Sequence, residues 1–129
     1  MANGDDFTPE ELREYVKPLE LIKRGVDELS RKEGIEAKYY TRGWPHIALT
    51  WSNRFDLSCL VQLYMDTDKS TYILWAVASK DVDQQRYAQK KELHRGIKPP
   101  FDEGYIIAEM KKGIELCNSW KFEDLTLST

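Results

Sequence analysis

The sequence of 129 residues contains only two cysteines and no long hydrophobic run. Cys59 and Cys117 stand far apart, without a CxxC pair or a Cys/His cluster, which argues against a zinc site. We expect both thiols to be reduced and buried. The alternative is a disulfide between them. The longest apolar run, near residues 72–78, is far below the roughly 20 residues of a membrane helix, so we expect no membrane association.

Common phosphate-binding and hydrolase motifs are also missing, namely GxGxxG, GxxxxGK[ST] and GxSxG. Asp66 and Asp68 have the opening spacing of a calcium loop, but Thr71 and Val77 replace the glycine and the final glutamate that such a loop requires. This segment therefore predicts a hairpin turn. We expect no metal and no cofactor, and the sequence favours a non-enzymatic protein, although dispersed carboxylates would leave no local motif.

Composition and charge describe an ordinary folded domain. Hydrophobic residues make up 41% and aromatic residues 12%, which is typical of a packed core and not of a disordered chain. The net charge of −3 disfavours binding to nucleic acid or to an anionic membrane through the overall field. Residues 1–6 are small, polar and acidic, unlike a secretory signal. We expect one soluble, cytoplasmic domain over residues 1–129, with 1–6 and 126–129 frayed.

Positive charge is concentrated in residues 86–98, where a single glutamate, Glu92, accompanies five cations: Arg86, Lys90, Lys91, Arg95 and Lys98. Cations with Tyr87 among them occur on nucleic-acid-binding surfaces. The alternatives are a solvated face that offsets nearby carboxylates, or a surface that docks an acidic protein. The acidic remainder of the chain makes nucleic acid the less favoured partner.

The first helix has clear boundary signals. Thr8 and Glu11 form a capping box, and apolar residues then recur at helical spacing. Pro18 interrupts this pattern, because proline lacks an N–H group and crowds the preceding turn. We therefore predict a kink or a break at Pro18, giving helices over residues 9–17 and 19–33.

Strand-like segments follow at residues 35–41, 46–52, 57–65 and 71–78. Their short connections predict an antiparallel meander. Residues 81–98 fit either a helix or a fifth strand. Asp102 can cap a last helix, whose apolar stripe comprises Ile106, Ile107, Met110, Ile114 and Cys117.

The predicted fold class is α+β, an antiparallel meander of four or five strands with a kinked or broken N-terminal helix and a C-terminal helix packed on one face. Strand alternation directs Cys59, Val61 and Leu63 toward the helices, and Leu60 and Tyr64 to the opposite face. For the segment 71–78, which is apolar on both sides, we place Trp75 inward and Tyr72 outward.

The face opposite the helices then becomes a candidate partner-binding surface. Its proposed members are Tyr40, Arg42, His46, Leu60, Tyr64 and Tyr72. A mixture of aromatic, apolar and basic groups suits an interface better than bare solvent or a dry core. The alternative is that residues 81–98 or the C-terminal tail fold over this face.

Three functional hypotheses remain. The first is a non-enzymatic binding or accessory protein whose partner is another protein or a second copy of itself, similar only in size and charge to toxin immunity proteins and secretion chaperones. The second is a small enzyme or ligand-binding domain, with a pocket between the sheet and the last helix that uses His46. Under this hypothesis the ligand is a small molecule. The third is weak nucleic-acid binding through residues 86–98.

Overall fold

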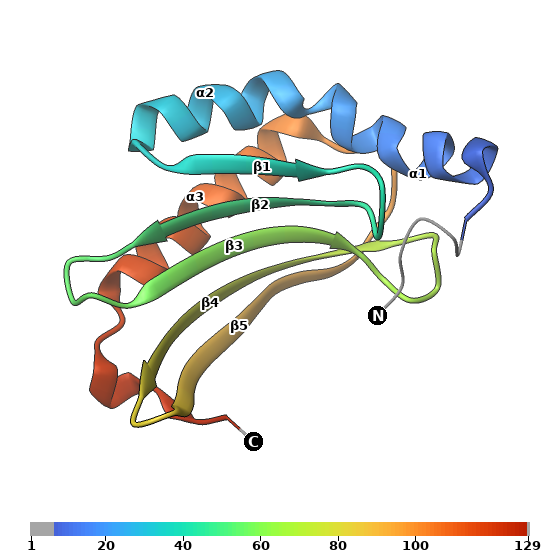
Figure 1. Cartoon of the computed structure of the whole chain (residues 1–129). Coiled ribbons are helices and arrows are strands. Elements are labelled where there is room, and N and C mark those ends of the chain that lie inside the picture. Colours follow the sequence, from blue (N-terminus) through green and yellow to red (C-terminus); the bar gives the residue numbers. More distant parts are fainter. Residues whose placement is uncertain (1–6, 129) are drawn as a thin grey trace.

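The computed structural model describes residues 7–128. In chain order it consists of two N-terminal helices, one antiparallel sheet and a C-terminal helix, followed by a short tail (Figure 1). The elements are α1 (Pro9–Leu21), α2 (Lys23–Glu33), β1 (Glu36–Tyr40), β2 (His46–Ser52), β3 (Ser58–Met65), β4 (Tyr72–Val82), β5 (Gln85–Ile97), α3 (Glu103–Ser119), a 3-10 turn (Phe122–Asp124) and β6 (Thr126–Leu127). The strands lie in chain order from β1 to β6. The α+β meander is therefore confirmed, and the ambiguous segment 81–98 forms the long strand β5, so the sheet is one strand larger than the upper expectation.

The N-terminal helix begins as predicted and breaks later than predicted. Thr8 Oγ1 accepts a hydrogen bond from the Glu11 N–H at 3.1 Å, and Glu11 Oε1 accepts one from the Thr8 N–H at 3.0 Å, which completes the capping box. The predicted break at Pro18 is wrong, because α1 continues through this residue and ends at Leu21. Proline costs the helix one backbone hydrogen bond without ending it. The break between α1 and α2 falls instead at Ile22, which is only 2% exposed.

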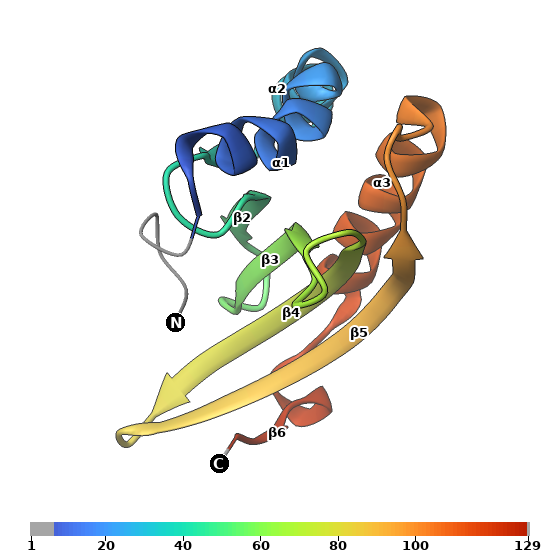
Figure 2. The same ribbon diagram turned by 90° about the vertical axis from the view of Figure 1, so that its right-hand side faces the viewer.

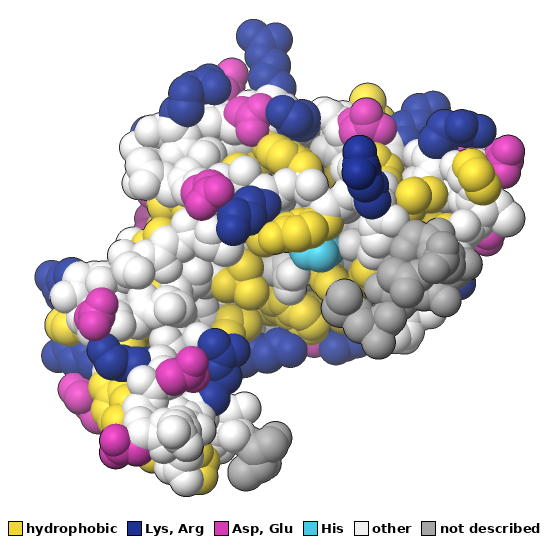
Figure 3. Space-filling view, viewed as in Figure 1, with side chains coloured by type: hydrophobic (Ala, Val, Ile, Leu, Met, Phe, Trp, Pro, Cys, Tyr) yellow, Lys and Arg dark blue, Asp and Glu magenta, His cyan; other side chains and the backbone are white. Residues whose placement is uncertain are grey.

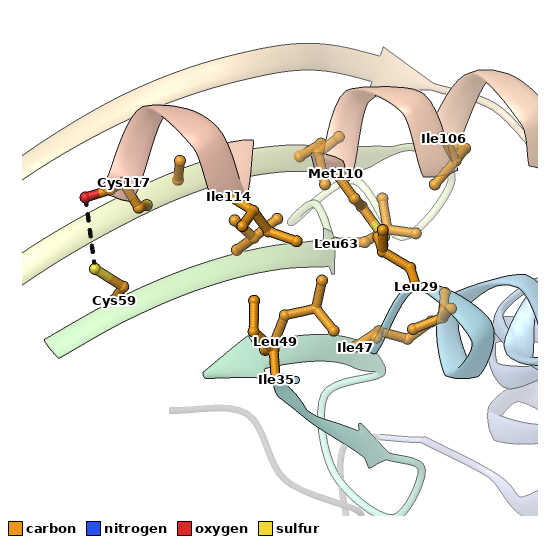
Figure 4. Packing of buried hydrophobic residues seen from close by; sticks show 14 of the residues in the cluster. Leu29, Ile35, Ile47, Leu49, Cys59, Leu63, Ile106, Met110, Ile114 and Cys117 are labelled. Carbon is orange, nitrogen blue, oxygen red and sulfur yellow. Dashed lines mark hydrogen bonds between the residues drawn. The ribbon is translucent and has the colours of Figure 1, made fainter. Parts of the chain in front are cut away.

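All three long helices pack on one side of the sheet (Figure 2). Helix α3 crosses β3 and β4, while α1 and α2 lie over β2 and β1. The inward side chains of the sheet and α3 are fully buried, among them Ile47, Leu49, Val61, Leu63, Leu74, Met110 and Ile114 (Figure 4). The predicted orientation of the third strand and the apolar stripe of the last helix are thus confirmed.

Helix α3 approaches the sheet closely at Gly113. A Cβ atom at this position would lie 2.9 Å from Leu93 Cδ1 and 3.0 Å from Val61 Cγ2. On β4, the residues that face the helix are the small Ala76 and Ala78, both 0% exposed. Because α3 packs so closely here, there is room only for small β4 side chains beneath it.

Trp75 and Val77 of β4 consequently point away from the helices, contrary to our prediction. The register pairs Gln62 with Trp75 and Leu60 with Val77 across β3 and β4, so these side chains share the uncovered face. Tyr72 takes the opposite orientation: it is 2% exposed, and its hydroxyl donates to the Tyr15 carbonyl at 2.6 Å. The assignment of Tyr72 to the outer surface is wrong, because an apolar strand on both sides offers no periodic signal to decide its orientation.

The C-terminal tail extends the sheet. Thr126 and Leu127, expected to fray, pair with Ala88 and Tyr87 of β5, and Leu125 is buried. Strands β5 and β6 extend the curved sheet by pairing at its edge (Figure 1), and Ser128, after β6, reaches the uncovered face beside Arg86 and Ala88. The expected frayed residues 1–6 and 129 lie outside the described residues. Between residues 7 and 128, no helix has the length and apolar character needed to cross a membrane.

The two cysteines meet beneath the C-terminal end of α3. Both are buried free thiols, and Cys59 Sγ lies 3.7 Å from the Cys117 carbonyl oxygen (Figure 4). The neighbouring Cys59 thiol, together with burial, raises the pKa of Cys117. Their expected burial is confirmed.

Candidate functional site: the outer face of the sheet

The sheet face without helices, called the outer face below, is organised in rows that run across the strands. Each row consists of residues that pair directly across neighbouring strands. The first row is Tyr40, His46, Tyr64 and Ile73, and the second is Lys38, Ala48, Gln62, Trp75 and Glu92. The third is Glu36, Thr50, Leu60, Val77 and Lys90, and the fourth is Ser52, Ser58, Ser79 and Ala88. Side chains opposite each other in neighbouring strands are close enough to interact. The first three rows therefore hold large groups, and the fourth holds only small ones.

Four rings form an aromatic ladder across β1 to β4, namely Tyr40, His46, Tyr64 and Trp75. Tyr40 and His46 stack with centroids 4.1 Å apart and an interplanar angle of 11°. His46 and Tyr64 follow at 5.1 Å, and Tyr64 and Trp75 at 5.8 Å. Lys90 of β5 ends the ladder, since its Nζ lies 3.5 Å from the centroid of the Trp75 ring. Hydrophobic side chains gather on this face in the space-filling view (Figure 3).

Hydrogen bonds fix the orientation of the ladder. The Trp75 indole N–H donates to Gln62 Oε1 at 2.6 Å, and His46 Nδ1 lies 2.7 Å from the Trp44 carbonyl oxygen. Trp44 in turn donates its indole N–H to the Met65 carbonyl, and its ring stacks on Tyr64 with a centroid distance of 6.2 Å. The rings are therefore held by neighbours on the same face before any partner arrives.

Burial also determines the charge state of the ladder. It lowers the pKa of His46, an effect that the hydrogen bond to the Trp44 carbonyl partly opposes. It raises the pKa of Tyr64. Both groups are consequently neutral near pH 7, so the ladder is an uncharged strip with a cation at its β5 end.

The outer face is neither open to water throughout nor closed like a core. Tyr40 is 42% exposed, whereas Leu60, Tyr64 and Trp75 are half-buried. Full burial of Leu60 and Tyr64 would have excluded a surface role for these residues, and it does not occur. Arg42 is exposed in the turn between β1 and β2, next to this face.

A hollow of about 460 Å³ opens beside the ladder, where the row of small residues crosses β3, β4 and β5. Its lining includes Leu60 and Val77 from one row, Ser58, Ser79 and Ala88 from the next, and Arg86 of β5. Ligand pockets commonly measure about 300–1,000 Å³, so the hollow can receive a large side chain. The sequence analysis missed this feature because it depends on the pairing of three strands.

The cations of residues 86–98 separate in space. Alternation along β5 puts Lys90 on the outer face and Lys91 opposite Ala76, on the other side. Arg86 pairs with Asp81 at 3.1 Å, and Arg95 pairs with Glu92 at 2.6 Å. The segment therefore does not present all five cations to one ligand; Lys98 follows the end of β5.

His46 does not lie between the sheet and the last helix, where our second hypothesis placed it. His46 lies on the outer face, whereas α3 covers the inner face at the close contact of Gly113. His46 does border a smaller hollow of about 310 Å³ beneath α1, together with Leu19, Glu20 and Tyr39. Its ring nitrogen contacts the Trp44 carbonyl, and it forms no hydrogen bond with a carboxylate within residues 7–128.

The ladder offers little stacking area to nucleobases. Rings on neighbouring strands already contact one another, and Lys90 covers Trp75 from the β5 side. Recognition of single-stranded nucleic acid depends on aromatic faces that bases can stack on. The surface combines these rings with the aliphatic side chains of Leu60 and Val77, a mixture that also occurs in protein interfaces.

The structure adds Trp75, Gln62 and Lys90 to the outer face. The sequence analysis did not place these three residues on one surface. The alanines at positions 76 and 78 were the available signal, because small residues on one side of a strand indicate a closely packed helix there. The chain matches no protein-family model, no curated protein and no solved structure. The class of protein therefore rests on the fold and on the outer face alone.

Proposed function

We propose that the protein is a non-enzymatic binding or accessory domain that holds a partner protein on its outer face. The observation that carries this proposal is the asymmetry of the sheet: every long helix packs on one side, and the aromatic ladder with Leu60 and Val77 remains half-exposed on the other. Contiguous apolar patches on a protein surface mark interaction sites.

The side chains of the outer face have the properties of interface anchors. Tyr and Trp supply large apolar areas with polar tips, and such residues dominate the binding energy of many complexes. Tyr64 lies near the middle of the face, with Trp44, His46 and Trp75 around it. Because these neighbours already hold its ring, a partner would order few additional rotamers on binding, which favours affinity.

The direct test is affinity capture from an extract of the cells that make the protein. Immobilised wild-type protein is compared with the double variant Tyr64→Ala/Leu60→Ser, and bound proteins are identified by mass spectrometry. We expect a specific partner to bind the wild type and to bind the double variant at least about tenfold more weakly, as loss of an interface anchor implies.

A matched control removes exposed apolar groups from the helices instead. Leu21 is 67% exposed on α1 and Tyr105 is 40% exposed on α3, so Leu21→Ser/Tyr105→Ala makes a similar chemical change on the other side. This control is expected to retain the partner. The proposal is wrong if both double variants retain it equally. Sedimentation velocity over a range of concentrations detects the alternative partner, a second copy.

A further inference from the structure

We infer that the segment bound on the outer face is an acidic peptide segment of the partner, which inserts an apolar side chain into the hollow between Leu60 and Ser79 and places carboxylates against Lys38, Arg42 and Lys90. This inference rests on the proposed function and specifies the chemistry of its partner. Two observations carry it, the form of the hollow and the distribution of charge around it.

The hollow is lined by branched apolar and small residues. Leu60 and Val77 face each other across β3 and β4, and the next row pairs Ser58 with Ser79 and Ser79 with Ala88. The change from branched apolar to small residues creates a depression in an otherwise filled face. An aliphatic or aromatic side chain would bury its surface there, which is favourable by roughly 25 cal/mol per Å².

Ser79 adds a polar group to this hollow. It is only 8% exposed, lies on the outer side of β4 and lines the depression. Its hydroxyl makes no hydrogen bond with any residue from 7 to 128. Since no buried polar side-chain atom between residues 7 and 128 lacks a partner, this hydroxyl reaches solvent in the hollow, where it is available to a polar group of the bound segment, such as a backbone N–H or carbonyl.

The charges on the face favour an acidic partner. Lys38, Arg42 and Lys90 form no ion pair within the described part of the chain, whereas Glu92 is already paired with Arg95. Two further carboxylates lie on the described part of this face: Glu36, and Asp81 in the row beyond Ser79, which is paired with Arg86. A face-to-face dimer would bring these unpaired cations of two copies together, and like charges across an interface disfavour association. Charge complementarity thus selects an acidic segment over a second copy.

The test uses random 12-residue peptides displayed on phage and selected on the full-length protein. We expect the enriched peptides to combine at least one large apolar residue with flanking Asp or Glu. One enriched peptide, synthesised with a fluorophore, then serves as the probe for anisotropy titrations. Its affinity should fall as ionic strength rises, because exposed charge pairs are screened by salt.

Variants of the full chain locate the binding site. Ser79→Leu fills the hollow, and Ala88→Leu fills it from the neighbouring strand in case the first change disturbs folding. Each is expected to weaken peptide binding about tenfold or more. Lys90→Glu should weaken it about threefold to tenfold, whereas the matched change Lys91→Glu, on the other side of β5, should leave it within about twofold.

Several results would overturn the inference. These are selection of neutral or basic peptides, no enrichment at all, unchanged binding by both hollow-filling variants, or equal effects of Lys90→Glu and Lys91→Glu. A labelled 12-nucleotide single-stranded DNA that binds with the same variant dependence would assign the face to nucleic acid instead, and a dimer that Tyr64→Ala dissociates would assign it to self-association. If capture still depends on Tyr64 and Leu60 while the peptides are not acidic, only this inference fails and the proposed function stands.

Discussion

The two faces of the sheet come from the same strands, yet they reach different degrees of packing. On the inner face, Val61 and Leu63 are 0% exposed beneath α3. On the outer face, Leu60 and Tyr64 of the same strand remain half-buried, although they are comparably apolar or aromatic. Alternation supplies both faces with apolar groups, but the helices cover only one of them. The difference supports the division that we propose, with stability residing on the inner face and binding on the outer face.

The strongest test of this division is the removal of an inner-face side chain. Met110 of α3 is 0% exposed and packs in the core, so Met110→Ala is expected to lower the free energy of unfolding by about 2–5 kcal/mol through lost burial and a cavity. Lys111 is exposed in the same helix, and Lys111→Ala should stay within about ±0.5 kcal/mol. Urea unfolding measures both. Equal effects would contradict the helix orientation.

The junction between the sheet and α3 is expected to depend on Asn53. This residue, 7% exposed, donates from Nδ2 to the Cys117 and Trp120 carbonyls and accepts at Oδ1 from the Phe55 and Leu57 N–H groups. Asn53→Ala leaves buried backbone groups without partners and should cost about 2–4 kcal/mol. Thermal and urea unfolding provide the measurement. The matched control is Glu115→Ala, an exposed position on α3. An equally small cost of both changes would show that the Asn53 bonds do not stabilise the junction.

The Thr8 cap has an intermediate effect. Thr8→Ala removes the side-chain acceptor for the Glu11 N–H and should cost about 0.5–2 kcal/mol in urea unfolding. Thr8→Ser retains an acceptor and should recover most of the loss. Since α1 lies on the inner side of the sheet, partner binding on the outer face is expected to change little. An unchanged unfolding midpoint would contradict the role of the cap.

The smallest expected effect is the pH dependence contributed by His46. Burial lowers its pKa in the folded protein, so the unfolded chain, with a value near 6.5, takes up a proton first as the pH falls. The stability that neutral His46 contributes is therefore present above about pH 6.5 and is lost as the pH falls through the lower folded value. His46→Phe should reduce the drop in urea midpoint between about pH 7.5 and 5.5. An identical drop in the wild type and in His46→Phe would refute this assignment.

The sequence predicted the elements whose signals are local. The cap at Thr8, the alternation of β3 and the apolar stripe of α3 each depend on residues close in the chain, and each is confirmed. The orientation of β4 was wrong because Trp75 and Tyr72 both suit an apolar environment, and only the close approach of α3 decides between them. Lys90 over Trp75 and the hollow at Ser79 depend on pairing between strands, which periodicity within one strand does not specify.

The outer face as binding surface is tested most directly by carbene footprinting of the protein, alone and in complex with the captured partner. Labelling by a small carbene reports which side chains become protected on binding. The account predicts protection of Tyr64, Leu60 and Trp75, with unchanged labelling of Leu21 on α1 and Tyr105 on α3. Protection of the helices together with unchanged labelling of the outer face would contradict it.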